Sequence, residues 1–186
     1  AIGLSLLFGI FLPFNFNSPL QSTSIIDFWQ RWHMSLTKFI NQYLFNPLSL
    51  KMIRYSMGKT PLIETFFSLV FPILITFFLL GIWHGANWTF AIFGMIHALL
   101  MILNHLWRNR NFFKSIDNHY FTKNIYWLLT FLSVIFSFVI FRSENVDTGF
   151  LIYKGMLGNN GINFIMPNIK LIIILIISMI LILKTK

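Results

Sequence analysis

Three apolar stretches of about twenty residues dominate this sequence, at residues 62–81, 89–107 and 124–141. A helix needs roughly 20 apolar residues to cross the hydrocarbon core of a bilayer, and only helices and closed barrels satisfy all their backbone hydrogen bonds there. The chain is 56% hydrophobic and only 10% charged, whereas soluble domains are about 25% charged. A shorter apolar run follows at residues 171–183. We therefore predict an all-α membrane protein, a multi-span helical bundle without a separate soluble domain.

The basic residues predict how this bundle is oriented. The net charge is +9, but the Lys and Arg residues lie mainly between the apolar stretches, which indicates contact with lipid headgroups and not with nucleic acid. If every stretch crosses the bilayer, 11 of the 14 basic residues share one side, and the other side keeps only Arg142, Lys154 and Lys170. Basic loops face the cytoplasm. We expect a cytoplasmic C-terminus, with the connection at residues 82–88 on the opposite side.

A helix of a different kind is predicted at residues 24–44. Ser24 stands three residues before Asp27, as in a capping box, and Asp27 can pair with Arg31 four residues on. Apolar residues at helical spacing form one face, which includes His33. The segment is too polar for a lipid-facing span, so an interfacial or re-entrant helix is expected.

The segments around this helix are predicted to be irregular. Residues 1–12 are apolar but too short to span a bilayer, which is typical of the tail of a truncated span. Two prolines and two asparagines at residues 13–19 indicate an irregular turn. Pro47 is expected to end the helix, with basic loops following at residues 51–59 and a mixed loop at residues 142–170.

The connection between the first two spans carries the strongest chemical signal. Residues 82–88 read Ile-Trp-His-Gly-Ala-Asn-Trp. A charged side chain at membrane depth costs roughly 2.5 kcal/mol or more, whereas a histidine can stay neutral and exchange a proton near neutral pH. His84 is therefore a candidate general base, and Gly85 would let backbone groups approach a ligand closely. The alternative is a histidine that packs a helix turn and hydrogen-bonds a carbonyl group.

The other histidines have different surroundings. His33 lies on the aromatic face of its helix, where few other polar groups occur. His97 sits within a span, where a helix-packing hydrogen bond is as good an explanation as a direct role. His105 and His119 fall at a membrane edge and in a basic loop, where we expect solvated side chains. No metal site is predicted, because the sequence has neither an HExxH motif nor a nearby pair of carboxylates.

The residues that are absent narrow the chemistry further. The chain has no cysteine, no GxSxG motif for a serine hydrolase and no glycine-rich phosphate loop. The mechanism that remains is one in which a general base acts without a protein nucleophile. Such a base suits direct transfer, in which it takes the proton of an acceptor hydroxyl while that hydroxyl attacks an activated acyl group. A dry site would protect the acyl group from water.

Two blocks of the sequence resemble motifs of the membrane-bound O-acyltransferase (MBOAT) family. Residues 27–36 read Asp-Phe-Trp-Gln-Arg-Trp-His-Met-Ser-Leu, similar to the family's D-F-W-x-R-W-H-x-S-L motif. Residues 80–88 resemble its W-H-G block, and residues 94–97 the G-x-x-H that follows. The segments around Phe141-Arg142 and residues 155–158 look like the alginate O-acetylase-like subfamily. One departure is Ser49-Leu50, where that subfamily usually has two glycines.

The resemblance implies a fold and a site. The family fold is a ring of helices around a thin waist, and residues 1–186 would be the C-terminal part of that one domain. It implies that His84 is the catalytic histidine and His33 the second functional one, without a metal. The residues expected to line the substrate cavity are Trp83, Asn87, Trp29, Arg31, Asp27 and His97.

The resemblance also implies a reaction in the bacterial cytoplasmic (inner) membrane. An acetyl group would pass to hydroxyls of an exported polysaccharide, either an alginate-like polymer or peptidoglycan. The donor would be acetyl-CoA or another acyl thioester, no cofactor would be bound, and an extracytoplasmic SGNH-type acetyltransferase or esterase would be a partner. As a fragment, the 186 residues alone are expected to be inactive. The alternatives are D-alanyl transfer to teichoic acid, and a transporter or scaffold whose histidines serve proton coupling.

Overall fold

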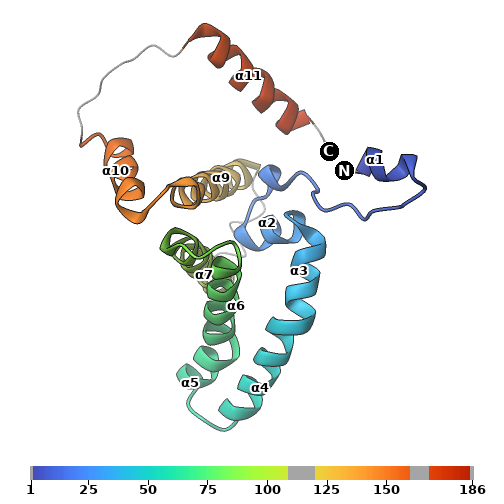
Figure 1. Ribbon diagram of the computed structural model, residues 1–186. Coiled ribbons are helices and arrows are strands. Elements are labelled where there is room, and N and C mark those ends of the chain that lie inside the picture. Colours follow the sequence, from blue (N-terminus) through green and yellow to red (C-terminus); the bar gives the residue numbers. More distant parts are fainter. Residues whose placement is uncertain (1, 109–119, 160–167, 185–186) are drawn as a thin grey trace.

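The chain folds as helices throughout the part that the structure describes. This computed structural model describes residues 2–108, 120–159 and 168–184, is 80% helical and shows no strand among these residues (Figure 1). Three helical stretches are long and apolar enough to cross a membrane, Pro61–Trp83, Trp88–Arg108 and Thr122–Arg142. The predicted all-α membrane fold and its three longer spans are therefore confirmed. His119 and most of the predicted basic loop around it lie outside the described residues.

The helices follow one another with short connections. In chain order they are α1 (Ile2–Leu7), the 3-10 turn η1 (Pro19–Gln21), α2 (Ile25–Arg31), α3 (Met34–Ile40), the π-helical turn η2 (Asn41–Phe45), α4 (Asn46–Ser56), α5 (Pro61–Thr65), the π-helical turn η3 (Phe66–Val70), α6 (Phe71–Trp83), α7 (Trp88–Arg108), α9 (Tyr120–Arg142), α10 (Val146–Met156) and α11 (Ile169–Lys184).

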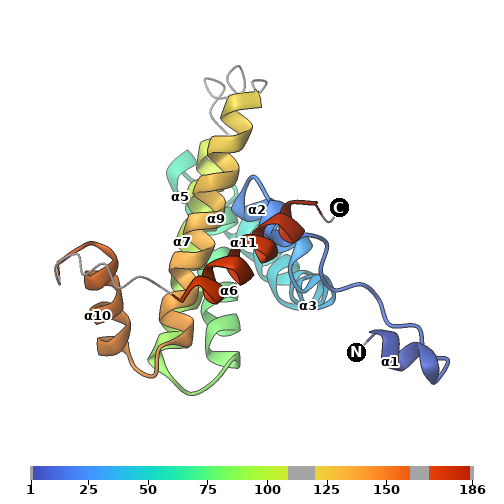
Figure 2. The same ribbon diagram turned by 90° about the horizontal axis from the view of Figure 1, so that it is seen from above.

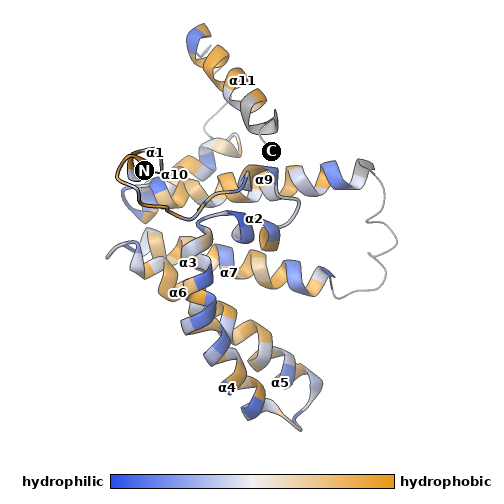
Figure 3. Cartoon of the chain, turned by 90° about the vertical axis from the view of Figure 1, so that its right-hand side faces the viewer, coloured by the Kyte–Doolittle hydropathy of each residue, from blue (hydrophilic) through white to orange (hydrophobic). Residues whose placement is uncertain are grey.

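The outer faces of the spans are apolar. Only 28%, 39% and 22% of the three spanning segments are buried inside the chain, and large side chains such as Leu99, Leu129 and Leu132 are more than half exposed. Figure 3 shows orange, hydrophobic residues along the outer surfaces of α7 and α9. An apolar surface of this extent is suited to lipid or to further membrane helices and not to water.

Helices α6 and α7 touch through their backbones. A Cβ atom added to Gly94 would collide with the carbonyl oxygen of Phe77 and would lie 3.2 Å from the Cα of Gly81. A Cβ atom on Gly81 would similarly collide with the carbonyl oxygen of Phe90. Small residues allow this close approach between helices in a membrane. The two glycines thereby hold α6 close to α7 beside the connection that carries His84. Helix α7 also packs against α9 (Figure 2).

Two long helical arms form a hairpin that projects from this bundle (Figure 1). One arm consists of α3, η2 and α4, and the other of α5, η3 and α6. The prediction that Pro47 ends a helix and that a basic loop follows is wrong, because α4 continues through Pro47 and carries Lys51 and Arg54. Proline lacks an N–H group and its ring crowds the carbonyl of the preceding turn. In both arms a π-helical turn precedes the proline, η2 before Pro47 and η3 before Pro72, and this wider turn accommodates the proline ring.

The predicted helix at residues 24–44 is broken in the middle. Its start is as expected, since the Ser24 hydroxyl accepts a hydrogen bond from the Asp27 N–H at 3.1 Å. However, α2 ends at Arg31 and α3 begins at Met34, because His33 adopts the left-handed conformation with φ 47° and ψ 54°. The buried side chains of the pair belong to α2. Only α2 therefore enters the core, where it packs against α7 (Figure 3).

The terminal regions also differ from the expectations. Helix α1 stops at Leu7 and Gly9 takes a positive φ of 69°, so the apolar residues 1–12 do not form one helix. The predicted loop at residues 142–170 contains α10, which starts where the Asn145 side chain accepts a hydrogen bond from the Thr148 N–H at 2.8 Å. Helix α11 has 16 residues, fewer than the roughly 20 that a perpendicular crossing needs.

Candidate active site

His84 lies at the C-terminal end of α6, on a surface of aromatic rings. Its N–H bonds back to the Gly81 carbonyl at 3.0 Å, which ends the helix. The imidazole is exposed on one side, and on the other it meets the rings of Trp83 and Phe141 at centroid distances of 5.0 and 5.1 Å. Gly85 is needed beside it, since a Cβ there would lie 2.7 Å from the Phe90 ring. The histidine is thus open to a ligand above an apolar floor.

Trp83 and Asn87 flank this histidine and have different roles. The Trp83 side chain is 64% exposed, so it stands free to cover a ligand. The Asn87 amide donates to the Glu144 carbonyl at 2.8 Å, and its oxygen accepts from the Thr89 N–H at 3.2 Å. These bonds start α7 and tie it to the segment between α9 and α10. Asn87 therefore fixes the shape of the connection.

His33 occupies the break between α2 and α3. It lies half-buried beside Phe16, with ring centroids 6.0 Å apart. Its Nδ1 atom is buried and has no hydrogen-bond partner among the described residues. An unpaired buried nitrogen is unfavourable by about 1–3 kcal/mol. A substrate group that bonded to this nitrogen would remove that penalty.

A row of aromatic rings runs from the residue beside His33 to the ring on which His84 rests. Trp32, the neighbour of His33, lies 5.7 Å from Phe138, and Phe138 lies 6.1 Å from the Phe141 ring on which His84 rests. Burial lowers the pKa of His84, and the charge that His33 carries when protonated lowers that pKa further. The fold therefore places the segments that carry the two histidines at opposite ends of one row of aromatic rings. That one substrate cavity holds both stays a prediction.

His97 lies in the core, where its two ring nitrogens are both occupied. The Trp29 indole N–H donates to Nδ1 at 3.3 Å, and Nε2 lies 2.8 Å from the Ser137 hydroxyl. That hydroxyl donates to the Val134 carbonyl at 2.7 Å, so Nε2 carries the proton and the imidazole is neutral. The side chain is 0% exposed. This is the helix-packing position considered above as the alternative for His97, joining α2, α7 and α9.

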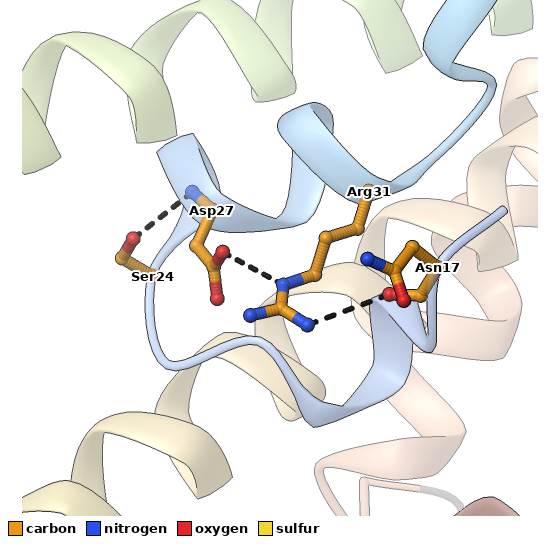
Figure 4. A network of polar contacts seen from close by, with 4 residues as sticks. All are labelled: Asn17, Ser24, Asp27 and Arg31. Atoms are coloured by element: carbon orange, nitrogen blue, oxygen red, sulfur yellow. Dashed lines mark hydrogen bonds and ion pairs between the residues drawn. The ribbon is translucent and has the colours of Figure 1, made fainter. Parts of the chain in front are cut away.

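Asp27 and Arg31 form an ion pair on the outer face of α2 (Figure 4). The Arg31 Nε donates to the Asp27 Oδ1 at 2.7 Å, as the spacing predicted. A second guanidinium nitrogen of Arg31 reaches the carbonyl oxygen of Asn17 at 3.5 Å. The pair therefore fastens α2 to the segment before it.

Two cavities lie beside α2, and neither is lined by His33 or His84. The larger, of about 630 Å³, opens at the end of α7 near the basic residues Arg108 and Lys123, and Asp27 borders it. The smaller, of about 180 Å³, lies between the α2–α3 arm and the α6–α7 pair and is lined in part by Trp29. The predicted lining residues thus divide among different surfaces.

Sequence reasoning missed residues that shape the site. Phe93 and Phe141 complete the aromatic floor under His84, and Asn15 and Phe16 border His33. The Asn-Phe-Asn string between two prolines was a visible signal, because a polar pair in an apolar region needs partners. No group of three or more His, Cys, Asp or Glu side chains that could hold a metal ion occurs in the described ranges.

Comparisons with known proteins identify the family of this chain. The model of the membrane-bound O-acyltransferase family matches residues 1–146. A peptidoglycan O-acetyltransferase of Helicobacter pylori is 36% identical over 166 residues, which cover 88% of this chain and 28% of that protein. A probable alginate O-acetylase AlgI of Azotobacter vinelandii is 36% identical over 156 residues, covering 84% and 28%.

A more distant relative is a teichoic acid D-alanyltransferase of Streptococcus thermophilus, 29% identical over 160 residues, which cover 81% of this chain and 38% of that protein. The chain thus spans less than a third of the length of its O-acetyltransferase relatives. The family-model match over residues 1–146 nonetheless includes both histidine blocks and all three spans. The chain belongs to the membrane-bound O-acyltransferase family.

Proposed function

We propose that this chain carries the catalytic histidines of a bacterial membrane O-acyltransferase that moves an acetyl group onto hydroxyls of an exported polysaccharide. The observation that carries the proposal is the row of aromatic rings that joins the segments of His84 and His33, which lie far apart in the sequence. His84 is the base and stands on the exposed side of that row. His33 offers an unpaired nitrogen to a substrate group.

The chemistry needs a base that is neutral at physiological pH. Burial and His33 both lower the pKa of His84, which keeps its imidazole free to accept a proton. His84 takes the proton of an acceptor hydroxyl as the hydroxyl oxygen bonds to the thioester carbonyl carbon. The carbon–sulfur bond then breaks, and the leaving thiolate receives the proton from His84. The products are an acetyl ester and a free thiol, and the histidine is regenerated.

The relatives guide the choice of substrates. Their names support peptidoglycan or an alginate-like polymer as the acceptor. A thioester such as acetyl-CoA fits a reaction that has no protein nucleophile. The donor would arrive from the cytoplasmic side of the inner membrane, the side on which the charge distribution predicts most basic residues and the C-terminus. An extracytoplasmic SGNH-type acetyltransferase or esterase would act with it on the polymer.

D-alanyl transfer to teichoic acid is the second candidate. It is favoured by similarity to teichoic acid D-alanyltransferases, including a Bacillus subtilis protein that is 33% identical over 145 residues. The two candidates share the base and differ in the acyl group. Labelled acetate and labelled D-alanine, supplied to the same cells, distinguish them by which label reaches the envelope polymer as a base-labile ester.

The role of His84 is tested in the complete protein, in a strain that lacks its own enzyme. H84A should reduce base-labile acetyl on the wall or capsular polymer by about 10²–10⁴-fold, the usual loss on removal of a general base. H105A is the matched control, because His105 lies toward the other end of α7, and it should retain most activity. Normal acetylation by H84A, with equal amounts of protein in the membrane, would refute the proposal.

A further inference from the structure

The segment that contains Asn15 and Asn17 runs beside the break at His33 and holds it from both sides. The Asn17 N–H donates to the Arg31 carbonyl at 3.0 Å, just before the break. The Met34 N–H donates to the Asn15 carbonyl at 2.8 Å, just after it. The last residue of α2 and the first residue of α3 are thus both tied to one short segment, with His33 between them.

The Asn15 side chain supplies the cap that α3 lacks. His33 stands at the N-cap position but makes no side-chain capping bond. The Asn15 Oδ1 accepts instead from the Ser35 N–H at 3.0 Å and from the Ser35 hydroxyl at 2.5 Å. The first N–H groups of a helix have no partner within the helix. An asparagine from outside α3 therefore stabilises its start directly after His33.

The backbone of His33 needs such support. Its φ of 47° is in the left-handed region, which is unfavourable by roughly 1–2 kcal/mol for a residue with a Cβ atom. Strained residues persist only where their surroundings fix them, and they cluster at functional sites. Phe16, between the two asparagines, adds a ring at 5.0 Å from Trp32 and another contact at 6.0 Å from His33.

We propose that Asn15 is a positioning residue, which holds the α2–α3 break and thereby fixes the position of the His33 imidazole beside Phe16. This inference rests on the proposed function, in that His33 must take part in transfer. Asn15 acts on the reaction through His33 alone. Without its Oδ1, Ser35 loses both of its bonds to Asn15 at the start of α3, and the backbone of His33 relaxes toward an ordinary conformation.

The test compares substitutions at Asn15 in the complete protein, by initial rates of acetyl transfer in membranes matched for protein content. N15L keeps the size of the side chain and removes the acceptor, and we expect a loss of about 10–100-fold, since a displacement near 1 Å at a catalytic site costs about 10²-fold. N15D keeps an acceptor at the start of α3, where a carboxylate is also favourable, and should restore the rate to within about threefold of wild type.

Two further variants separate positioning from folding. N17A is the matched control, because Asn17 bonds Arg31 through its backbone atoms, and it should keep at least about half of the rate. The double variant N15L/H33Q should be no slower than H33Q, because a residue that acts only through His33 has nothing left to position. If N15L does not accumulate, S35A weakens the same cap more gently and should show the same non-additivity with H33Q.

The outcomes are distinct. Full activity of H33Q would contradict the proposed role of His33, whatever N15L does. If H33Q is inactive or slow while N15L is as fast as wild type, only the positioning inference is overturned. A loss in N15L that multiplies the loss in H33Q, or that N15D does not rescue, would show that Asn15 serves the fold in general and would overturn the inference as well.

Discussion

The closest contact between the spans can be tested by adding one methyl group. G94A places a Cβ on the face of α7 that touches α6, where it would collide with the carbonyl oxygen of Phe77 and lie 3.1 Å from its carbonyl carbon. Both partners are backbone atoms, so no side chain can turn aside. The helices must separate by about 1 Å at this point, an overpacking that typically costs 1–3 kcal/mol.

Two effects set the net change in the stability of G94A. Alanine is favoured over glycine within a helix by about 1 kcal/mol, so the expected net loss of stability is about 0–2 kcal/mol after the collision is included. The separation also moves the end of α6, where His84 stands. Because a shift of about 1 Å can reduce catalysis about 10²-fold, activity should fall more steeply than stability.

The assay pairs a thermal denaturation curve in detergent with acetyl transfer in membranes. G3A is the matched control, because Gly3 lies in α1 with no atom within 4 Å of the added Cβ, and it should neither lower stability nor change activity. A G94A protein that is as stable as wild type and fully active would refute the inferred backbone contact between α6 and α7, and with it the fixed geometry of the connection that carries His84.

Three other predictions concern charge, orientation and the core. Burial and, secondly, His33 lower the pKa of His84 from its ordinary 6.5, so the acidic limb of the pH–rate profile should lie below pH 6.5. H33Q removes the contribution of His33 and should move this acidic limb to higher pH. An acidic limb that stays in place or moves to lower pH would contradict the coupling of the two histidines. Single cysteines are clean probes of orientation in this cysteine-free chain. With an impermeant maleimide in intact cells, K154C should react and K59C should not. The reverse pattern would show that the predicted orientation is wrong. S137A removes the hydroxyl that bonds the buried histidine of α7 and should lower stability by about 1–3 kcal/mol; an unchanged denaturation curve would show that this bond is dispensable.

Local features of the sequence determined the spans and the contacts within single helical turns. Length and hydropathy are properties of a continuous segment, so the three spans could be predicted before any contact was known. The Ser24 cap and the pair of Asp27 with Arg31 join residues within one helical turn, and both occur as predicted. The place of His84 between two spans follows from the same local pattern.

The tertiary structure decided where the chain departs from these local rules. The break at His33 depends on hydrogen bonds from Asn15 and Asn17, and no periodicity within residues 24–44 shows them. The helix through Pro47 depends on a π-helical turn, which relieves a clash that proline would otherwise impose.

The role of His97 was likewise decided only by the fold. The sequence left a packing role and a direct role equally open, because both place a histidine within a span. The assembled structure sets the Trp29 indole against one ring nitrogen and the Ser137 hydroxyl against the other, from two further helices. A buried polar side chain takes whichever partners the packing of distant segments supplies. For this reason the sequence could only propose histidines for a site, whereas the tertiary structure shows which of their nitrogens are already bonded and which have no partner among the described residues.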